Sequence, residues 1–228
     1  MAELRIGKAE VAALAEQPGA PSKLSSILRL RTAAVHRRAE QSGIIADILA
    51  GKASRLGYAL LLANLLPAYE ALEQQIIGGQ ARPELDRVAA IEADLLAIAG
   101  PDWRRTLPRL DSATRYAERI RSTHAGDGAL ALAHAYVRYL GDLSGGLVLA
   151  RLLARNLDLR PDQLSYYRFP AIGDVAAYKD DYRRALDAAD LPSPRLSQVA
   201  DEALAAFELN VALSIDVRGV ALELAGRA

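Results

Sequence analysis

The chain has 228 residues, of which 51% are hydrophobic, with a formal net charge of zero and no cysteine. This length is enough for one large domain or two small ones with a substantial core, and the neutral charge argues against a protein that binds nucleic acid mainly by neutralising phosphates. The lack of cysteine excludes disulfides, thiolate metal sites and cysteine nucleophiles, and it fits a reducing compartment.

The N-terminal stretch MAELRIGKAEVAALAEQ (1–17) carries acidic and basic residues throughout, which is unlike a signal peptide. We interpret residues 1–22 as a loosely ordered extension in which 3–16 form a short helix before the breaker QPGAPS. No run of about 18 apolar residues lacks charge. The chain is therefore expected to be soluble and cytoplasmic, without a membrane anchor.

Helical periodicity and strong helix formers dominate the remaining sequence, and strand alternation is nearly absent. Clusters of glycine and proline separate the periodic segments. We expect a single all-α domain over residues 23–220, with Asp174 and Ser193 as N-caps of the last two helices. The predicted helices cover residues 24–41, 53–77, 84–99, 112–123, 129–157, 174–189 and 195–217.

The first predicted helix has an apolar stripe formed by Leu24, Leu28, Val35 and Ala39. At 100° per residue, His36 falls about 100° from the centre of this stripe. Taken alone, that position is typical of an ordinary histidine at the boundary between the core and the solvent.

The fifth predicted helix contains the unusual string YLGDLSGGL. Each glycine inside a helix costs about 1 kcal/mol relative to alanine, so three glycines cost about 3 kcal/mol. Taking Gly141 as zero, Gly145 lies at about 40° around the helix axis and Gly146 at about 140°. Asp142 lies between them at about 100°. One side of this helix therefore presents bare backbone and a single carboxylate.

Two interpretations of the bare backbone remain open at this point. The glycines could allow another helix to pack closely, or they could allow a flat ligand to lie against a helix that bends at its weak point. Asp142 favours the ligand, because a carboxylate in a helix–helix contact is costly unless it is paired. Beside a ligand the same group could order water or transfer protons.

Other chemistries are excluded by missing residues. Gly141 and Gly146 have phosphate-loop spacing, but the lysine and hydroxyl that should follow are absent. Ser144 lacks the glycine that a nucleophile elbow requires two residues earlier. No Glu-x-x-His pair exists, which argues against a di-iron bundle. Of the two remaining histidines, His134 lies on the glycine helix itself and cannot reach the far side of a ligand there, and His124 lies in a glycine-rich turn.

The pattern of these segments resembles the haem (heme) oxygenase family. AHAYVRYLGDLSGG looks like the family's distal helix, and TAAVHRRAE looks like its proximal helix. The resemblance continues, in family order, through LLPAYEALE, GPDW, YKDDYRRAL and AFELNVAL, and it covers about residues 24–217. It implies one α-helical domain in which haem lies between the proximal helix and a kinked, glycine-rich distal helix.

The resemblance also implies roles for individual residues. His36 matches the ligand to the haem iron, and Glu40 matches the acid that hydrogen-bonds the other imidazole nitrogen. Asp142 matches the distal acid that orders water near bound oxygen. The glycines Gly141, Gly145 and Gly146 match the backbone that covers the haem. The remaining matches are Tyr69, Arg138 and Asn210 in the polar network, Phe207 in the pocket wall, and Arg29, Tyr136, Lys179 and Arg183 at the propionates.

The implied reaction is oxidation of haem by O2 and reducing equivalents to biliverdin, carbon monoxide and ferrous iron, with haem as both substrate and cofactor. The implied electron donor is a ferredoxin or a flavoprotein reductase, and the implied state is a monomer or weak dimer of the soluble bacterial type. Alternatives are a haem carrier or sensor of the same fold and a helical interaction module. Leu147 replaces the glutamine usual in the family and should point away from the glycine face.

Overall fold

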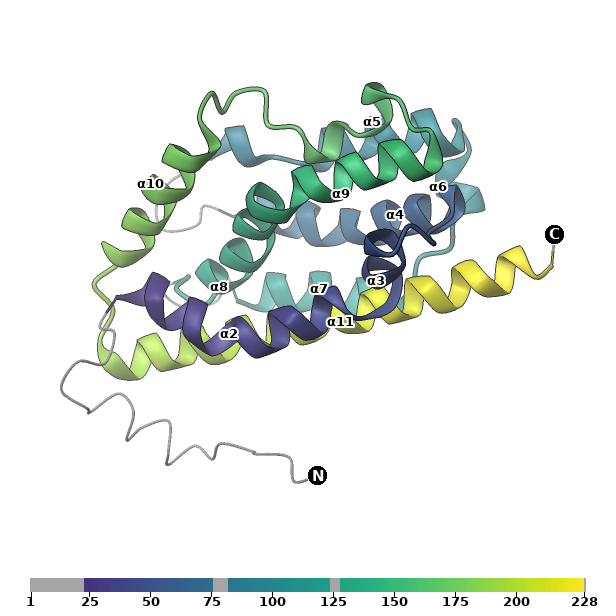
Figure 1. Ribbon diagram of the computed structural model, residues 1–228. Helices are drawn as coiled ribbons and strands as arrows, with labels where there is room; N and C mark the ends of the chain where they lie inside the picture. Colours follow the sequence, from purple (N-terminus) through teal and green to yellow (C-terminus); the bar gives the residue numbers. More distant parts are fainter. Residues whose placement is uncertain (1–22, 76–81, 124–127, 228) are drawn as a thin grey trace.

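The computed structural model describes residues 23–75, 82–123 and 128–227, and these contain helices and no strand. The predicted single all-α domain is confirmed (Figure 1). The predicted extension 1–22, with its short helix, and His124 lie outside the described residues. None of the described helices combines the length and apolar character that crossing a membrane requires.

The helices fall into two groups along the chain, those before residue 123 and those after residue 128. The first group contains α2 (Leu24–Glu40), α3 (Gly43–Leu49), α4 (Arg55–Glu73), the 3₁₀ turn η1 (Pro83–Leu85), α5 (Val88–Ala99), α6 (Trp103–Thr106) and α7 (Asp111–Ser122). The second group contains α8 (Ala131–Ala135), the π-helical segment η2 (Tyr136–Leu140), α9 (Gly141–Leu157), the 3₁₀ turns η3 (Pro161–Gln163) and η4 (Ser165–Tyr167), α10 (Val175–Asp187) and α11 (Ser193–Ala225).

The predicted helix boundaries are correct in most places. The short helices α3 and α6 were not predicted, and α11 continues to Ala225 instead of ending near residue 217. Asp174 is confirmed as an N-cap, since its side chain accepts hydrogen bonds from the backbone of Ala176 and Ala177. Ser193 is not a cap but the first helical residue, because the prolines on either side of it set the backbone at this helix start.

Helix α4 forms the centre of the core. Every residue from Gly57 to Tyr69 is buried, and the helix packs against α5, α7 and α11. A helix that is apolar all round can be stable only when neighbours cover it on all sides. The sequence of α4 therefore places it inside the bundle, from where Tyr69 reaches the functional site described below.

Helices α2 and α11 run side by side in the same direction (Figure 1). Ion pairs join Arg31 to Asp201 and Arg38 to Glu208, and the constant offset in residue number is that of a parallel pair. The turn after α2 requires Gly43, which has φ +55° and whose added Cβ would lie 2.2 Å from the backbone of Ser214. This pairing holds α2 firmly beside the C-terminal helix.

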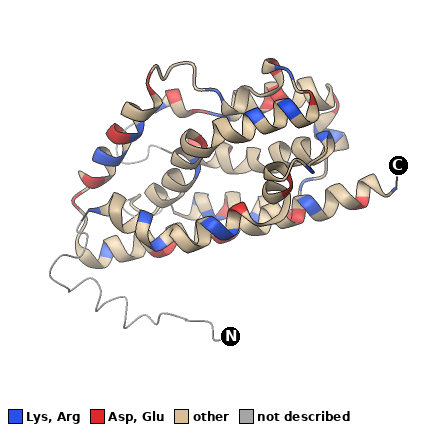
Figure 2. Ribbon diagram, viewed as in Figure 1, with Lys and Arg blue, Asp and Glu red and all other residues tan. Residues whose placement is uncertain are grey.

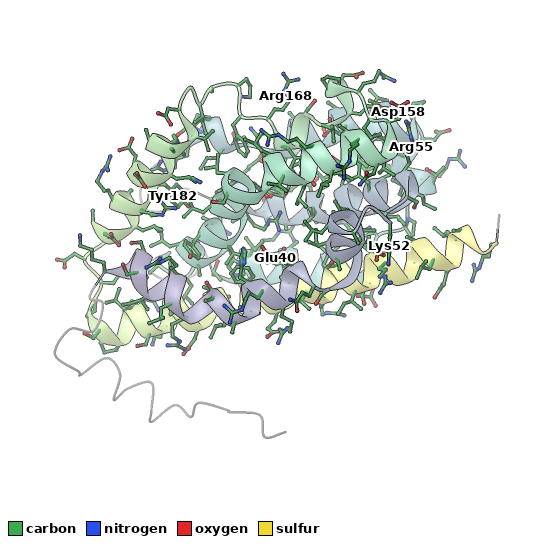
Figure 3. All side chains as sticks on the ribbon, in the orientation of Figure 1. Glu40, Lys52, Arg55, Asp158, Arg168 and Tyr182 are labelled. Atoms are coloured by element: carbon green, nitrogen blue, oxygen red, sulfur yellow. The ribbon has the colours of Figure 1, made fainter. Side chains whose placement is uncertain are left out.

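The predicted helix 129–157 is interrupted before its glycines. The five residues of η2 make a π-helical segment between α8 and α9, and the chain changes direction there (Figure 1). A π segment widens the helix and is common at functional sites. The far end of α9 is held by Arg55, which donates to the carbonyl groups of Leu157 and Asp158 at 3.0 and 2.8 Å (Figure 3).

A buried acid links α11 to the segment before the π helix. Glu202 accepts hydrogen bonds from His134, with 2.8 Å between Nε2 and Oε1, and from Arg119 on α7. Burial alone would raise the pKa of Glu202, but the His134 and Arg119 hydrogen bonds outweigh it and lower the pKa from 4.5 to about 2. The folded protein therefore binds this proton less readily than the unfolded chain does.

Replacing Glu202→Gln should lower the free energy of unfolding by about 2–3 kcal/mol at pH 7, a value reduced for the partial exposure of Arg119. Because the folded pKa is depressed, this stabilisation is complete above pH 4.5 and is lost as the pH falls towards 2. Urea unfolding at several pH values measures the difference between the two proteins. Glu118→Gln, at an exposed position of α7, is the control. If the difference in free energy of unfolding between the native protein and Glu202→Gln does not become smaller in acid, the stabilising role of the Glu202 carboxylate is contradicted.

Candidate functional site

A groove lies between α2 on one side and η2 with α9 on the other. Two adjoining cavities of about 460 and 410 Å³ form it. Both are lined by His36, Val137, Gly141, Ser144 and Phe207. One cavity extends towards the start of α2 and towards α10, and the other extends inward to α4. We call this space the α2–α9 groove.

The glycines of α9 have two different roles. A Cβ added to Gly141 or Gly145 would meet nothing within 4 Å, so both present bare backbone to open space. A Cβ added to Gly146 would lie 3.0 Å from the ring of Tyr167, so this glycine also allows that ring to pack against the helix. The predicted bare face exists, and part of it serves helix packing as well.

His36 extends from α2 into the groove, where its side chain is 52% exposed. Its ring makes an edge contact with Phe207, with 5.6 Å between the ring centroids. The Nδ1 atom lies 3.6 Å from a carboxylate oxygen of Glu40, which is longer than a hydrogen bond. An imidazole with an exposed edge and one nitrogen near a carboxylate is arranged to bind a metal through its other nitrogen.

The other described histidine does not compete for that role. His134 is fully buried, and its Nε2 donates to Glu202 outside the groove. No group of three or more histidine or acidic side chains among the described residues could hold a metal ion. A metal bound in the groove would therefore have a single protein nitrogen as ligand. Its other ligands would have to come from the bound group that contains the metal.

Asp142 is the centre of a buried polar network. Its carboxylate accepts hydrogen bonds from the hydroxyl of Tyr69 and, at 2.8 Å, from the hydroxyl of Tyr166. Arg138, one turn earlier, donates to the same carboxylate at 3.2 Å and to the Tyr69 hydroxyl at 2.8 Å. Arg138 also donates to Asn210 on α11 at 2.6 Å. We call these five residues the Asp142 network.

The electrostatics of the network suit proton transfer. Burial raises the pKa of Asp142, while Arg138 and the hydroxyls of Tyr69 and Tyr166 oppose that rise only in part. Burial also acts against the charge of Arg138, but the surrounding tyrosines and Asp142 hold its pKa well above the ordinary value. The pair thus contains a permanent cation and a carboxyl group that gives up its proton less readily than a free one.

Tyr166 is a member of this network that the sequence did not reveal. Its hydroxyl lies 2.8 Å from that of Tyr69 and accepts from Arg138 at 2.7 Å. The buried carboxylate of Asp94 on α5 fixes the η4 turn by accepting from the backbone of Ser165 and Tyr166 at 2.7 and 2.9 Å. Tyrosines in a short segment between two proline breakers offer no periodic signal, so only the packing identifies this residue.

The outer end of the groove is cationic. Arg29, Tyr136 and Arg183 line it together, and basic residues occur on both flanking helices, α2 and α10, with acidic residues also present on α10 (Figure 2). Burial raises the pKa of Tyr136. A hydrogen bond with Thr32 and the charges of Arg183 and Arg29 offset part of this rise. Arg183 also pairs with Asp180 at 2.6 Å. Lys179 lies one turn earlier on α10 and is not brought to the groove lining with the other three.

The remaining predicted positions lie as follows. Phe207 forms part of the groove wall, and Asn210 lines the inner cavity and also donates to the hydroxyl of Tyr116 at 2.8 Å. Leu147 is 51% exposed and lines a different cavity, as expected for a residue that points away from the glycine face. The groove therefore brings together the predicted site residues except Lys179 and Tyr69, and Tyr69 reaches it through Asp142.

Comparison with known proteins shows similarity over most of the chain. A family model described as heme oxygenase matches residues 22–216. "Heme oxygenase 1" of Homo sapiens is 34% identical over 204 residues, covering 85% of this chain and 71% of that protein. "Heme oxygenase 1" of Nostoc sp. is 31% identical over 214 residues, covering 90% of each chain.

A solved structure has the same fold. The crystal structure of heme oxygenase-1 from the cyanobacterium Synechocystis in complex with heme superposes with a TM-score of 0.82 at 30% identity, covering 90% of this chain and 96% of that one. The structure of heme oxygenase from Leptospira interrogans gives a TM-score of 0.78 at 31% identity, covering 85% and 99%.

Proposed function

This chain belongs to the haem oxygenase family, and we propose that the α2–α9 groove is where it binds haem, with His36 as the protein ligand to the iron. It is an enzyme that degrades haem to biliverdin, carbon monoxide and ferrous iron, using O2 and external reducing equivalents. Haem is both the substrate and the cofactor. The site assignments below are our proposal for how these residues serve that reaction.

The groove fits a flat macrocycle with a central metal. The half-exposed imidazole of His36 stands on one side, and the bare backbone of Gly141 and Gly145 on the other. Apolar side chains such as Phe207 line the walls. Arg29 and Arg183 lie at the outer end, whereas the cation at the inner end, Arg138, is paired with Asp142. This opposition of one imidazole to open glycine backbone is the observation that carries the proposal.

Haem supplies the iron that binds and activates O2, and it is also the molecule that is oxidised. Glu40 orients the imidazole of His36 by attracting Nδ1, so that Nε2 faces the groove. Gly141 and Gly145 carry no Cβ, and a Cβ at either position would meet nothing within 4 Å, so their backbone would leave room for a small ligand beside bound haem. The same backbone would limit the positions that such a ligand could take.

Asp142 holds and moves a proton at the distal side. Its carboxylate lines the inner cavity of the groove, where it binds water and passes protons from it towards the reacting oxygen. Tyr69, Arg138, Tyr166 and Asn210 hold this carboxylate in one position. Arg29, Tyr136, Lys179 and Arg183 bind the two propionates at the cationic end, Lys179 through the reach of its flexible side chain.

Replacing Tyr166→Phe should lower the rate of biliverdin formation by about three- to tenfold, since one hydrogen bond to Asp142 is lost. The hydroxyl lowers the pKa of Asp142, so its removal raises that pKa. The carboxylate is then protonated at a higher pH, and the acid limb of the rate profile should move upward by up to about one unit. Rates measured from pH 5 to 9 test this.

Tyr58→Phe is the matched control, because Tyr58 is equally buried and its hydroxyl has no hydrogen-bond partner among the described residues. Its rate profile should coincide with that of the native enzyme. Coincident profiles for Tyr166→Phe and the native enzyme would remove Tyr166 from the functional network.

The direct test of the function uses haem and a reductant. Purified protein should form a stoichiometric complex with haem, seen by absorption, and should lose the haem band and release biliverdin when reductant and air are supplied. A complex that is reduced and binds O2 but keeps its ring would instead support a carrier or sensor. Absence of any complex would contradict the groove assignment.

We propose further that a ferredoxin or a flavoprotein reductase delivers the electrons, and that the enzyme works in the cytoplasm as a monomer or weak dimer. The absence of cysteine is what a reducing compartment favours. Turnover with each purified donor, and the mass of the haem-loaded protein by light scattering, test these proposals.

A further inference from the structure

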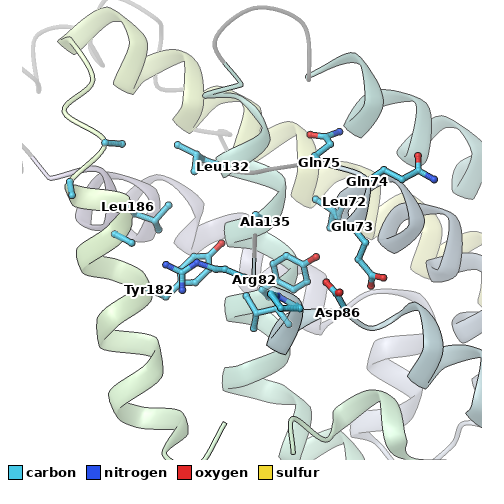
Figure 4. A pocket seen from close by; sticks show the side chains of 16 residues that line it. Leu72, Glu73, Gln74, Gln75, Arg82, Asp86, Leu132, Ala135, Tyr182 and Leu186 are labelled. Atoms are coloured by element: carbon cyan, nitrogen blue, oxygen red, sulfur yellow. The ribbon is translucent and has the colours of Figure 1, made fainter. Parts of the chain in front are cut away.

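A second cavity, of about 430 Å³, lies behind the π-helical segment, among the end of α4, the η1 turn, η2 and α10 (Figure 4). None of the residues that line it also lines the α2–α9 groove. Leucine and alanine residues of α4, η1, α8 and α10, with two alanines that follow α10, make up half of its lining residues. We call it the back cavity.

Two carboxylates meet at one end of the back cavity. The side chains of Glu73 and Asp86 point toward one another there (Figure 4), and each is part of the lining. Glu73 accepts backbone hydrogen bonds from Arg87 and Val88, but no ion pair is formed by either carboxylate within the described residues. Like charges brought together in this way favour binding of a cation between them.

Two tyrosines add unused polar groups to the same space. Tyr139 and Tyr182 line the cavity and are only 6% and 5% exposed. Neither hydroxyl makes a hydrogen bond with any residue that the structure describes. A hydroxyl that no protein group satisfies can form a hydrogen bond with a ligand that enters the cavity.

The hydroxyl of Tyr139 belongs to the acidic end. Burial raises the pKa of Tyr139, and the charges of Glu73 and Asp86 raise it further. The pKa values of Glu73 and Asp86 are themselves raised, first by burial. Arg87, which follows Asp86 in the chain, lowers the pKa of both carboxylates but does not cancel the rise.

The one arginine in the lining does not pair with these carboxylates. The guanidinium group of Arg82 lies over the ring of Tyr182, 5.0 Å from its centroid, and beside it in Figure 4. It donates to the hydroxyl of Tyr178 at 3.3 Å, and that hydroxyl donates to Glu84 at 2.6 Å. Arg82 is therefore engaged with the α10 side. The guanidinium group of Arg87, the cation that acts on both carboxylates, donates to the carbonyl groups of Leu85 and Arg168 and forms no ion pair with Glu73 or Asp86.

We propose that the back cavity binds a primary ammonium group on an apolar carbon skeleton, with the ammonium held by Glu73, Asp86 and the hydroxyl of Tyr139. Three oxygens match the three N–H donors of an ammonium group. The ring face of Tyr139 adds cation–π attraction, and the leucine and alanine wall covers the skeleton. A bare divalent ion fits less well, because the cavity is largely apolar and offers too few ligands.

Calorimetric titration of the full-length, haem-free protein with phenethylamine tests the site. Saturable binding with a Kd below about 1 mM is expected. 2-Phenylethanol, which has the same skeleton and no charge, should bind at least about tenfold more weakly. Raising NaCl from 0.05 to 0.5 M should weaken amine binding by about fivefold, because salt screens the carboxylates.

Variants locate the binding. Asp86→Asn, at an exposed position that tolerates substitution, should weaken phenethylamine binding about tenfold, and Tyr139→Phe should weaken it about threefold while the ring remains. Asp216→Asn removes the same charge from the exposed face of α11 and should leave the affinity within about twofold. Any of three results overturns the proposal. The first is binding that fails to saturate by about 10 mM phenethylamine. The second is equal affinity for the amine and the alcohol, and the third is equal affinity of the native protein and Asp86→Asn for the amine.

Discussion

Replacing His36→Ala should reduce haem turnover by more than about 100-fold, because it removes the proposed protein ligand to the iron. Haem should still enter the groove, where Phe207 and the cationic end remain, but its absorption spectrum should lose the features of imidazole coordination. The folding stability should change by no more than about 0.5 kcal/mol, since the side chain is half exposed. Absorption spectra and biliverdin yield measure both effects.

Added imidazole provides the decisive comparison for this variant. The space left by the side chain opens into the groove, so free imidazole should enter it and restore the native spectrum. Arg37→Ala, at the next exposed position of α2, should behave like the native enzyme. Unchanged turnover in His36→Ala would show that the iron takes its ligand elsewhere.

Replacing Asp142→Asn should lower the rate of biliverdin formation by about 100-fold or more, which is the usual contribution of a positioned acid–base group. Asparagine keeps the size of the side chain but cannot take up and release a proton. Haem affinity should stay within about threefold of the native value, because His36 and the groove walls are unaffected. The complex should bind O2 and then release it or decay without biliverdin.

The same substitution leaves Arg138 without its carboxylate partner in a buried place, which destabilises the protein by up to about 3–5 kcal/mol. Stoichiometric haem binding therefore serves as the check that the variant is folded. Asp216→Asn, an exposed acid of α11, controls for loss of charge. Normal biliverdin formation by a folded Asp142→Asn enzyme would exclude a proton-transfer role for this carboxylate.

These two substitutions separate two parts of the site. His36 belongs to α2, which is held by its parallel pairing with α11. Asp142 belongs to α9 and is held by residues from α4, η2, η4 and α11. His36→Ala should therefore remove iron coordination and leave the Asp142 network intact. Asp142→Asn should disturb the network and leave iron coordination intact.

The local features of this protein could be predicted from its sequence. Helix-forming residues and regular breakers predicted the all-α class and most helix positions, because helix periodicity depends on near neighbours in the chain. The string around Gly141 predicted a bare helix face with one carboxylate, and Gly141 and Gly145 do face open space. The roles of His36, Tyr69 and Asn210 came from the family resemblance, since His36 alone had the position of an ordinary histidine.

Only the tertiary structure decided which groups meet. The hydroxyl of Tyr166 reaches Asp142 because Asp94 fixes a turn 71 residues away in sequence. The π-helical segment lies just before the glycines, where periodicity predicted an uninterrupted helix. The acidic end of the back cavity brings Glu73, at the end of α4, together with Asp86, which follows η1. Such contacts depend on how helices pack on one another, and that packing is settled by burial over the whole bundle and not by the neighbours of any one residue.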